Sequence, residues 1–208
     1  MPHEAGLWIA IHGQKPLIAP NATNEGFFTN STIEHFYYSF ASSGVQSISF
    51  FVEHIDETRG WQGEWATYTS GKNAASYPAS VQESIGMTTL GFETTRNFVT
   101  LSDFRFGGGI GVGFGLGGTS ANVYDSATHL QNSYSSATLW EAFLVHVFLR
   151  ARYTVYSAAN YEIALQVMGR YWSFPFIGPV SAGGEAYNGP SLRAISELGY
   201  MAGVAVGF

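Results

Sequence analysis

The stretch that decides the fold is Phe104–Gly118, which reads Phe-Arg-Phe-Gly-Gly-Gly-Ile-Gly-Val-Gly-Phe-Gly-Leu-Gly-Gly. Large apolar residues recur at almost every second position, and the positions between them hold Arg105 and a row of glycines. A period of two places successive side chains on opposite faces of a strand. The stretch therefore predicts a strand across Leu101–Gly117, with one apolar face and one small or polar face.

The same alternation recurs on both sides of this strand. In Thr138–Tyr156, for example, Val145 and Val147 alternate with His146 and Arg150. We expect eight strands, at Ala5–Gly13, Ser31–Ala41, Val45–Ile55, Ser84–Thr95, Leu101–Gly117, Thr138–Tyr156, Asn160–Trp172 and Leu192–Phe208. The sequence thus predicts an all-β chain, folded over residues 1–208 as a single eight-stranded antiparallel up-and-down barrel.

The composition indicates that this barrel crosses a membrane. Charged residues make up 12% of the chain, about half the usual share. The longest apolar stretch, Ala137–Leu149, is broken by Thr138, Glu141 and His146, and it is too short for a transmembrane helix. One face of each predicted strand is almost purely apolar, whereas a soluble barrel would turn a polar face outward. A soluble lipocalin-like barrel is the alternative.

Composition also limits the partners. A net charge of −6 argues against a nucleic-acid partner, because phosphate binding needs basic clusters. The absence of cysteine excludes disulfides and thiolate metal sites. The start, Met1–Glu4, lacks a basic and an apolar signal region, so we expect that an export signal has been removed.

The predicted connections alternate in length. Those at 42–44, 96–100 and 157–159 are short, and those at 14–30, 56–83, 118–137 and 173–191 are long. Short periplasmic turns and long extracellular loops produce this alternation, with both chain ends in the periplasm. Outward aromatic residues at the turn-side strand ends predict an interfacial girdle. They are Phe40, Phe92, Phe104, Tyr153, Tyr161 and Phe208.

With this pattern the chain resembles the bacterial eight-stranded outer-membrane proteins, in the manner of the OmpA transmembrane domain, OmpX and OmpW. The C-terminal alternation of Tyr200, Ala202, Val204, Val206 and Phe208 is similar to that family's assembly signal. The resemblance implies a bacterial outer-membrane location, contact with membrane lipid and lipopolysaccharide, and recognition of the last strand by the barrel-assembly machinery. It implies no particular activity, because this fold carries several.

The inward positions form two mixed-sign layers. The layer near the turns holds Glu93, Asp103, Arg105, Arg150, Arg152 and Glu162, and the upper layer holds His12, Glu53, His146, Arg170, Arg193 and Glu197. Because an unpaired buried charge is costly, we expect these groups to pair and plug the barrel. A narrow polar conduit or a small-ligand pocket is the alternative, although eight strands leave little room beyond the side chains.

The glycine row contains a Gly-x-Gly-x-x-Gly match at Gly113, Gly115 and Gly118. No helix signal follows it, so a nucleotide-binding loop is not indicated. Inward glycines are expected to make room for large neighbours across the barrel. They could instead leave a void, which would be the path of a channel.

No catalytic, cofactor or metal residue is assigned. None of the six histidines is followed two positions later by serine, the His-x-Ser pattern of barrel lipid A deacylases. Pairing of Ser49 with His35 or His12 stays open, as does a metal site of His12, His146 and Glu53.

The leading hypothesis is a non-enzymatic outer-membrane protein, a structural or surface-interaction barrel whose extracellular loops are its contact surface. The aromatic loop residues are Trp61, Trp65, Tyr68, Tyr124, Tyr134 and Tyr187. The alternatives are a narrow channel or carrier for a small apolar solute and, second, a lipid-modifying enzyme.

Overall fold

The computed structural model describes residues 3–10, 15–16, 28–42, 45–67, 75–125, 131–174, 181–182, 185–186 and 195–208. The secondary structure in this part of the chain is all β. None of these residues forms a helix long and apolar enough to cross a membrane. The strands are β1 (Glu4–Ala10), β2 (Lys15–Pro16), β3 (Phe28–Ser42), β4 (Gln46–Thr67), β5 (Ala75–Leu101), β6 (Phe104–Asp125), β7 (Gln131–Ser157), β8 (Glu162–Phe174), β9 (Ser181–Ala182), β10 (Glu185–Ala186) and β11 (Ile195–Gly207).

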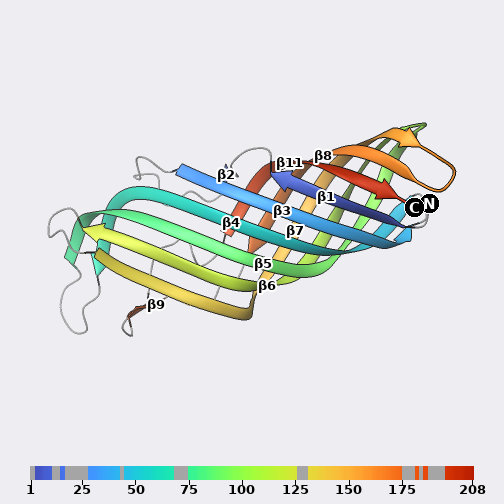
Figure 1. Cartoon of the computed structure of the whole chain (residues 1–208). Coiled ribbons are helices and arrows are strands. Elements are labelled where there is room, and N and C mark those ends of the chain that lie inside the picture. Colours follow the sequence, from blue (N-terminus) through green and yellow to red (C-terminus); the bar gives the residue numbers. More distant parts are fainter. Residues whose placement is uncertain are drawn as a thin grey trace.

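Eight of these strands close into a ring, β1-β3-β4-β5-β6-β7-β8-β11, in which every neighbouring pair is antiparallel. The first and last strands close it, with a register that runs from Glu4 opposite Gly207 to Ala10 opposite Met201. Strands β2, β9 and β10 are two-residue additions outside the ring. The structure confirms the predicted closed, eight-stranded, up-and-down barrel (Figure 1).

The outer face of the barrel is apolar. Along β3, β4, β7 and β11, exposed and buried residues alternate as the sequence pattern predicts. Large apolar side chains with at least a third of their surface exposed cover every strand of the ring. They include Leu7, Ile9, Phe36, Phe50, Phe92, Ile110, Val112, Phe114, Val147, Leu149, Leu165, Val167, Val204 and Val206. A continuous surface of this kind is unfavourable in water and matches the hydrocarbon core of a bilayer.

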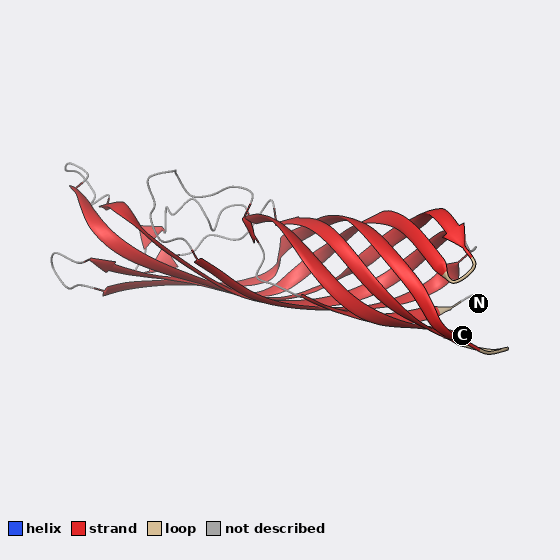
Figure 2. Cartoon of the chain, turned by 90° about the horizontal axis from the view of Figure 1, so that it is seen from above, coloured by secondary structure: helices blue, strands red, loops and turns tan. Residues whose placement is uncertain are grey.

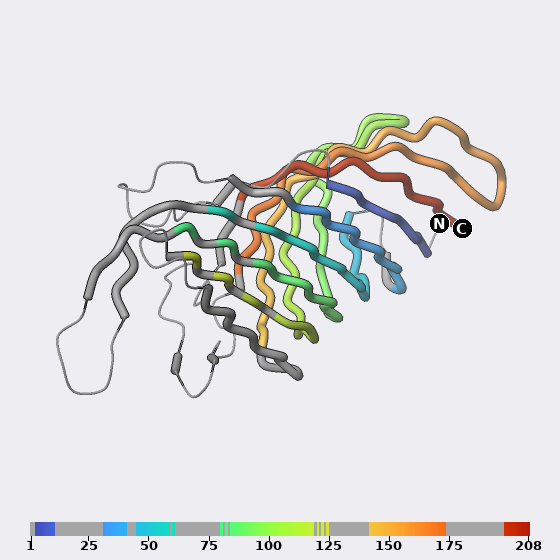
Figure 3. The backbone as a smooth tube through the Cα atoms, turned by 60° about the vertical axis from the view of Figure 1, so that its left-hand side comes forward, coloured from blue at the N-terminus to red at the C-terminus, as the bar shows by residue number. Residues whose placement is uncertain are grey.

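The strands on one side of the barrel are much longer than predicted. Strands β4 to β7 have 22 to 27 residues, whereas about 9–11 suffice to cross a bilayer. The predicted loops 56–83 and 118–137 are therefore largely wrong, because most of their residues belong to paired strands. In Figures 1 and 2 these strands extend as a wall beyond the ring, away from the end that carries both termini. The tube in Figure 3 shows the same arrangement.

The short turns lie at the end with the termini. Those after Ser42 and Ser157 fall where they are predicted. The predicted turn at 96–100 is wrong, because β5 continues to Leu101 through an irregularity between Asn97 and Val99. The chain instead reverses at Ser102 and Asp103, where Ser102 has a φ of 36°.

This turn also corrects one predicted interior residue. Asp103 is exposed at the turn, and its backbone carbonyl accepts a hydrogen bond of 2.8 Å from the Thr154 backbone N–H. Its carboxylate therefore does not belong to the interior layer. The bulge before the turn shifts the alternation by one residue, which a strict period of two does not anticipate.

The predicted girdle of aromatic residues is present at this end. Phe40, Phe92, Tyr153, Tyr161 and Phe208 are exposed, and Phe104 is partly exposed. The Phe40 and Phe92 rings meet edge to face at 6.5 Å. Their position at the edge of the apolar surface fits an interfacial belt.

The glycine row of β6 receives the large residues of neighbouring strands. A Cβ on Gly111 would overlap the His146 ring, and a Cβ on Gly109 would press into the Phe148 ring. On Gly115 it would lie 2.6 Å from the Met87 sulfur. Large side chains therefore fill the space beside Gly109, Gly111 and Gly115, and the Gly-x-Gly-x-x-Gly match lies within a strand.

We expect Gly111→Ala to destabilise the barrel by about 1–3 kcal/mol, because the added methyl group displaces the buried His146 ring. Gly169→Ala is the matched control, since its nearest neighbour is the Tyr200 ring at 4.0 Å. Urea unfolding measures the effect, and the intensity of the heat-shifted gel band gives the folded fraction at each urea concentration. Equal midpoints for the two variants would contradict this close packing.

Candidate functional site

A group of buried charged residues spans the middle of the barrel and is here called the central cluster: His35, Glu53, Glu93, His146 and Arg170. All five side chains are almost completely buried. Arg170 donates two hydrogen bonds to the Glu53 carboxylate, one of them of 2.6 Å from Nη2 to Oε1. His35 Nδ1 lies 2.8 Å from Glu53 Oε2. The bidentate geometry and the shared carboxylate compensate for the desolvation of both charges.

Glu93 links the two imidazoles of the central cluster. Its Oε2 lies 3.2 Å from His146 Nε2 and 3.5 Å from His35 Nε2. The Phe51 ring packs against both histidines, with ring centroids 5.0 Å from His35 and 5.1 Å from His146, and the two imidazoles contact each other edge to face at 5.7 Å. The cluster is thus wedged around an aromatic ring that leaves little space for solvent.

A second group, the basal cluster, lies nearer the turns and consists of Glu4, Arg105, Arg150, Arg152 and Glu162. Arg152 pairs with both carboxylates, through Nε to Glu4 Oε2 at 3.2 Å and through Nη2 to Glu162 Oε1. Arg150 and Arg105 add longer ion pairs, of 3.7 Å to Glu4 and 3.8 Å to Glu162. The two carboxylates therefore hold three guanidinium groups together.

Tyr37 lies above the basal cluster and is fully buried. Its hydroxyl donates to Glu4 Oε1 at 2.6 Å and accepts from Gln166 Nε2 at 2.9 Å. A Cβ at Gly6 would overlap the Tyr37 ring, so the glycine of β1 makes room for it.

An apolar layer closes the other side of the central cluster. Ile55 pairs with Met87 across β4 and β5, one inward position beyond Glu53. The buried residues of this layer are Ile33, Ile55, Ile85, Met87, Ala142, Leu144 and Trp172. The interior therefore holds two charged clusters and, beyond the central one, a layer of packed apolar side chains.

The predicted interior network is brought together in part. Glu53, His146 and Arg170 meet in the central cluster. Arg105, Arg150, Arg152 and Glu162 meet in the basal cluster. Arg193 lies outside the described residues, as does the side chain of Glu197, whose backbone pairs with Trp172.

Sequence reasoning missed two members of these clusters. The sequence pattern offers His35 as a partner of Ser49 but does not include it in the charged layers. Glu4 precedes the predicted first strand, although the ring pairs it with both Gly207 and Ser39. Alternation extended by one inward position, from Gly6 back to Glu4, was the signal that could have found it.

The enzymatic and metal alternatives find no support among the described residues. Ser49 Oγ pairs with Ser39 Oγ at 2.7 Å, and His35 faces the two glutamates rather than a hydroxyl. No group of three or more ligand-type side chains in this part of the chain could hold a metal ion. His12 lies outside the described residues.

A hydroxyl, an imidazole and a carboxylate also meet on the outer wall. His54 Nδ1 lies 3.0 Å from Thr88 Oγ1, and its Nε2 lies 3.2 Å from Asp56 Oδ2. The imidazole and the carboxylate are about half and two thirds exposed. Water screens such contacts, so the arrangement does not activate the hydroxyl and is a polar pair above the apolar surface.

No protein-family model and no curated protein matches the chain. Several solved structures resemble it, and three of them align along most of its length. The alignment with Neisserial surface protein A covers all of this chain and 98% of that protein, with 13% identity and a TM-score of 0.46. The alignment with the outer-membrane protease OmpT from Escherichia coli covers 86% of this chain and 62% of OmpT, with 10% identity and a TM-score of 0.42. The alignment with the outer-membrane protein OprG from Pseudomonas aeruginosa covers 99% of this chain and 94% of OprG, with 12% identity and a TM-score of 0.39.

We expect Arg170→Met to cost about 3–5 kcal/mol of stability, because it leaves the buried Glu53 carboxylate without its guanidinium. The double variant Glu53→Gln with Arg170→Met should recover most of this loss. Arg96→Met, at an exposed arginine, is the control and should change stability by less than about 0.5 kcal/mol. Urea unfolding in lipid vesicles, followed by tryptophan fluorescence, measures all three. A single variant as stable as the control would show that the pair is not needed.

Proposed function

We propose that this chain is a non-enzymatic integral protein of a bacterial outer membrane, a structural or surface-interaction barrel. The observation that carries the proposal is the packed interior, in which two ion-paired clusters and an apolar layer fill the ring. An eight-stranded barrel has an interior about as wide as its own side chains. With every layer occupied, the ring serves as an anchor, and function falls to the parts outside the bilayer.

The outer membrane is the location that best fits this architecture. A closed barrel satisfies its backbone hydrogen bonds within the ring, and bacterial outer membranes are spanned by such barrels. We propose that the short turns and both termini face the periplasm and that the long wall of β4 to β7 faces outward (Figure 1). The apolar surface between them would contact membrane lipid and lipopolysaccharide.

The wall offers the contact surface. Trp61 and Trp65 belong to β4, Tyr124 to β6 and Tyr134 to β7, so these aromatic residues are on strands and not on loops. Tyr68 and Tyr187 lie outside the described residues. Within the described chain, β4 pairs with β3 only as far as Gly60, so the last residues of β4 form a sheet edge. An open edge can add an extended segment of another protein through backbone hydrogen bonds.

The last strand supports a role in assembly. Tyr200, Val204, Val206 and Phe208 all point outward and are exposed, in the alternation that the assembly signal requires. We propose that the barrel-assembly machinery reads this face before β11 pairs with β1.

A channel for an apolar solute is the weaker alternative. Its proposed path was the glycine side of β6, but Phe51, His146, Phe148 and Met87 occupy the space beside those glycines.

The proposed orientation can be tested because the chain contains no cysteine. Tyr124→Cys, at the exposed upper part of β6, should react on intact cells with a polyethylene-glycol maleimide too large to cross the outer membrane. Asp103→Cys, in the exposed turn, should react only after the outer membrane is permeabilised. The reverse labelling pattern would show that the topology is the opposite of the proposed one. The cysteine-free chain is the control for labelling that does not depend on cysteine.

The closed interior predicts that planar bilayers containing the folded protein show no steady single-channel current, because ions would have to cross two paired charge layers and an apolar one. Insertion is verified beforehand by heat-shifted gel mobility. Steady currents that scale with salt concentration would overturn the anchor function in favour of the channel.

A further inference from the structure

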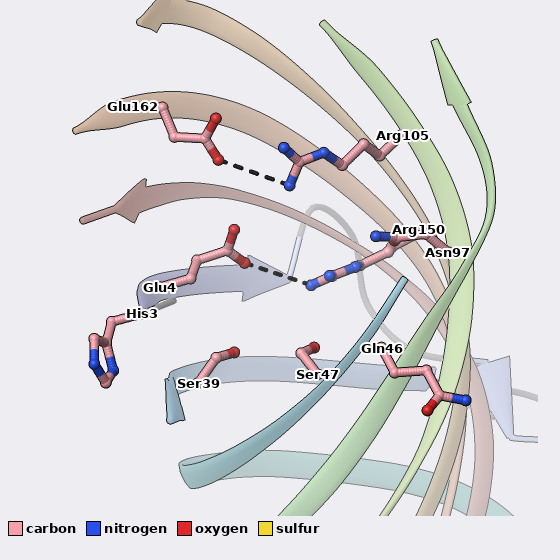
Figure 4. A pocket seen from close by; sticks show the side chains of 9 residues that line it. All are labelled: His3, Glu4, Ser39, Gln46, Ser47, Asn97, Arg105, Arg150 and Glu162. Atoms are coloured by element: carbon pink, nitrogen blue, oxygen red, sulfur yellow. Dashed lines mark ion pairs between the residues drawn. The ribbon is translucent and has the colours of Figure 1, made fainter. Parts of the chain in front are cut away.

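The basal end of the barrel contains a pocket between the ion-paired cluster and the turns. Polar and charged side chains from β1, β3, β4, β5, β6, β7 and β8 line it (Figure 4). They are His3, Glu4, Ser39, Gln46, Ser47, Asn97, Arg105, Arg150 and Glu162. In Figure 4 the Glu4 and Arg150 side chains lie between Ser39 and Ser47 on one side and Arg105 and Glu162 on the other.

The charges around this pocket do not balance. The basal cluster holds three guanidinium groups, on Arg105, Arg150 and Arg152, against the carboxylates of Glu4 and Glu162. Of the three guanidinium groups, that of Arg152 is nearest to each carboxylate, and Arg152 does not line the pocket. The pocket therefore keeps an excess of one positive charge, and the two arginines that line it are the less tightly paired ones.

Arg150 is the main candidate to bind a ligand. Its side chain is 8% exposed, and within the described residues its one ion pair is the 3.7 Å contact with Glu4, which is longer than a hydrogen bond. Its buried Nε has no hydrogen-bond partner. A buried guanidinium with unmet donors is costly, and such a group indicates a bound water, ion or ligand.

The other side chains that line the pocket supply further hydrogen-bond donors. Arg105 is about one third exposed and lies across the pocket, held by the 3.8 Å pair with Glu162. The hydroxyl of Ser47 and the amides of Gln46 and Asn97 come from the turn-side ends of β4 and β5. Two guanidinium groups with hydroxyl and amide donors form the donor set that recognises carboxylate or phosphate oxygens.

We propose that this pocket binds a small oxyanion, with Arg150 as the principal ligand-binding residue and Arg105 as the second. The ligand's oxygens accept hydrogen bonds from the guanidinium groups and offset the excess positive charge. The site is independent of the surface-interaction function, because it lies at the opposite end of the barrel from the wall (Figure 1).

The test titrates the folded protein in detergent micelles with sodium acetate and, separately, with inorganic phosphate. Sodium chloride holds the ionic strength constant, and NMR records the arginine Nε–H signals. We expect saturable shifts of the Arg150 and Arg105 signals with millimolar dissociation constants. Arg150→Gln should weaken binding by at least about tenfold, because the charge-assisted hydrogen bonds are lost. Arg105→Gln, at the more exposed position, keeps the test valid if the Arg150 variant does not fold.

Arg96→Gln is the matched control, since Arg96 directly precedes Asn97 but is exposed and does not line the pocket. It should bind both anions as the unchanged protein does. Shifts that do not saturate, or binding that Arg96→Gln weakens as much as Arg150→Gln does, would overturn the site. Saturation by acetate alone would still support it and would restrict the ligand to carboxylates.

Discussion

Closure of the ring between β1 and β11 is the constraint on which the rest of the structure depends. In a bilayer no water satisfies an exposed strand edge, so each backbone N–H and carbonyl within the hydrocarbon must find a partner in the protein. The register from Glu4 with Gly207 to Ala10 with Met201 provides those partners for the first and last strands. This closure fixes which side chains point inward, and it brings Glu4 from the start of the chain beside arginines of β7.

Closing eight strands leaves a narrow interior, and the sequence fills it by matching sizes across strands. Gly111 and Gly113 leave room for His146 and Phe51, and Gly203 lies against the Trp8 ring. Dense packing of this kind removes water from the charged groups, so each buried charge needs a compensating partner. The dense packing that the glycines permit is thus one reason why Glu53 needs the bidentate contact with Arg170.

The sequence predicts the ring well where one face meets lipid, because lipid requires an uninterrupted apolar alternation. It fails where that requirement ends. Beyond the apolar surface the wall strands carry Ser, Thr and Glu on positions that resemble a loop, yet their backbones stay paired as far as Thr67 and Ala75. At the other end a bulge near Asn97 moves the turn to Ser102, and Asp103 leaves the interior as a result. The alternation predicts that these charged side chains face the interior. It does not predict which acid pairs with which base, because the pairs depend on the strand register and on closure of the ring.

The two charged clusters solve the same electrostatic problem in different ways. The central cluster has two carboxylates, one guanidinium and two imidazoles, and packed side chains seal it from both ends. Within the described residues, its carboxylates face only partners inside the cluster, namely the Arg170 guanidinium and the two imidazoles. The basal cluster has three guanidinium groups and two carboxylates, and it borders a pocket near the turns. Among the described residues no third carboxylate pairs with these arginines, and the proposed external anion would supply the missing negative charge. The backbone ladder places the two clusters at different inward positions of β7, at His146 and at Arg150 and Arg152. The same ring thus holds one charged cluster that is paired within itself and another that borders a pocket where the proposed anion would bind.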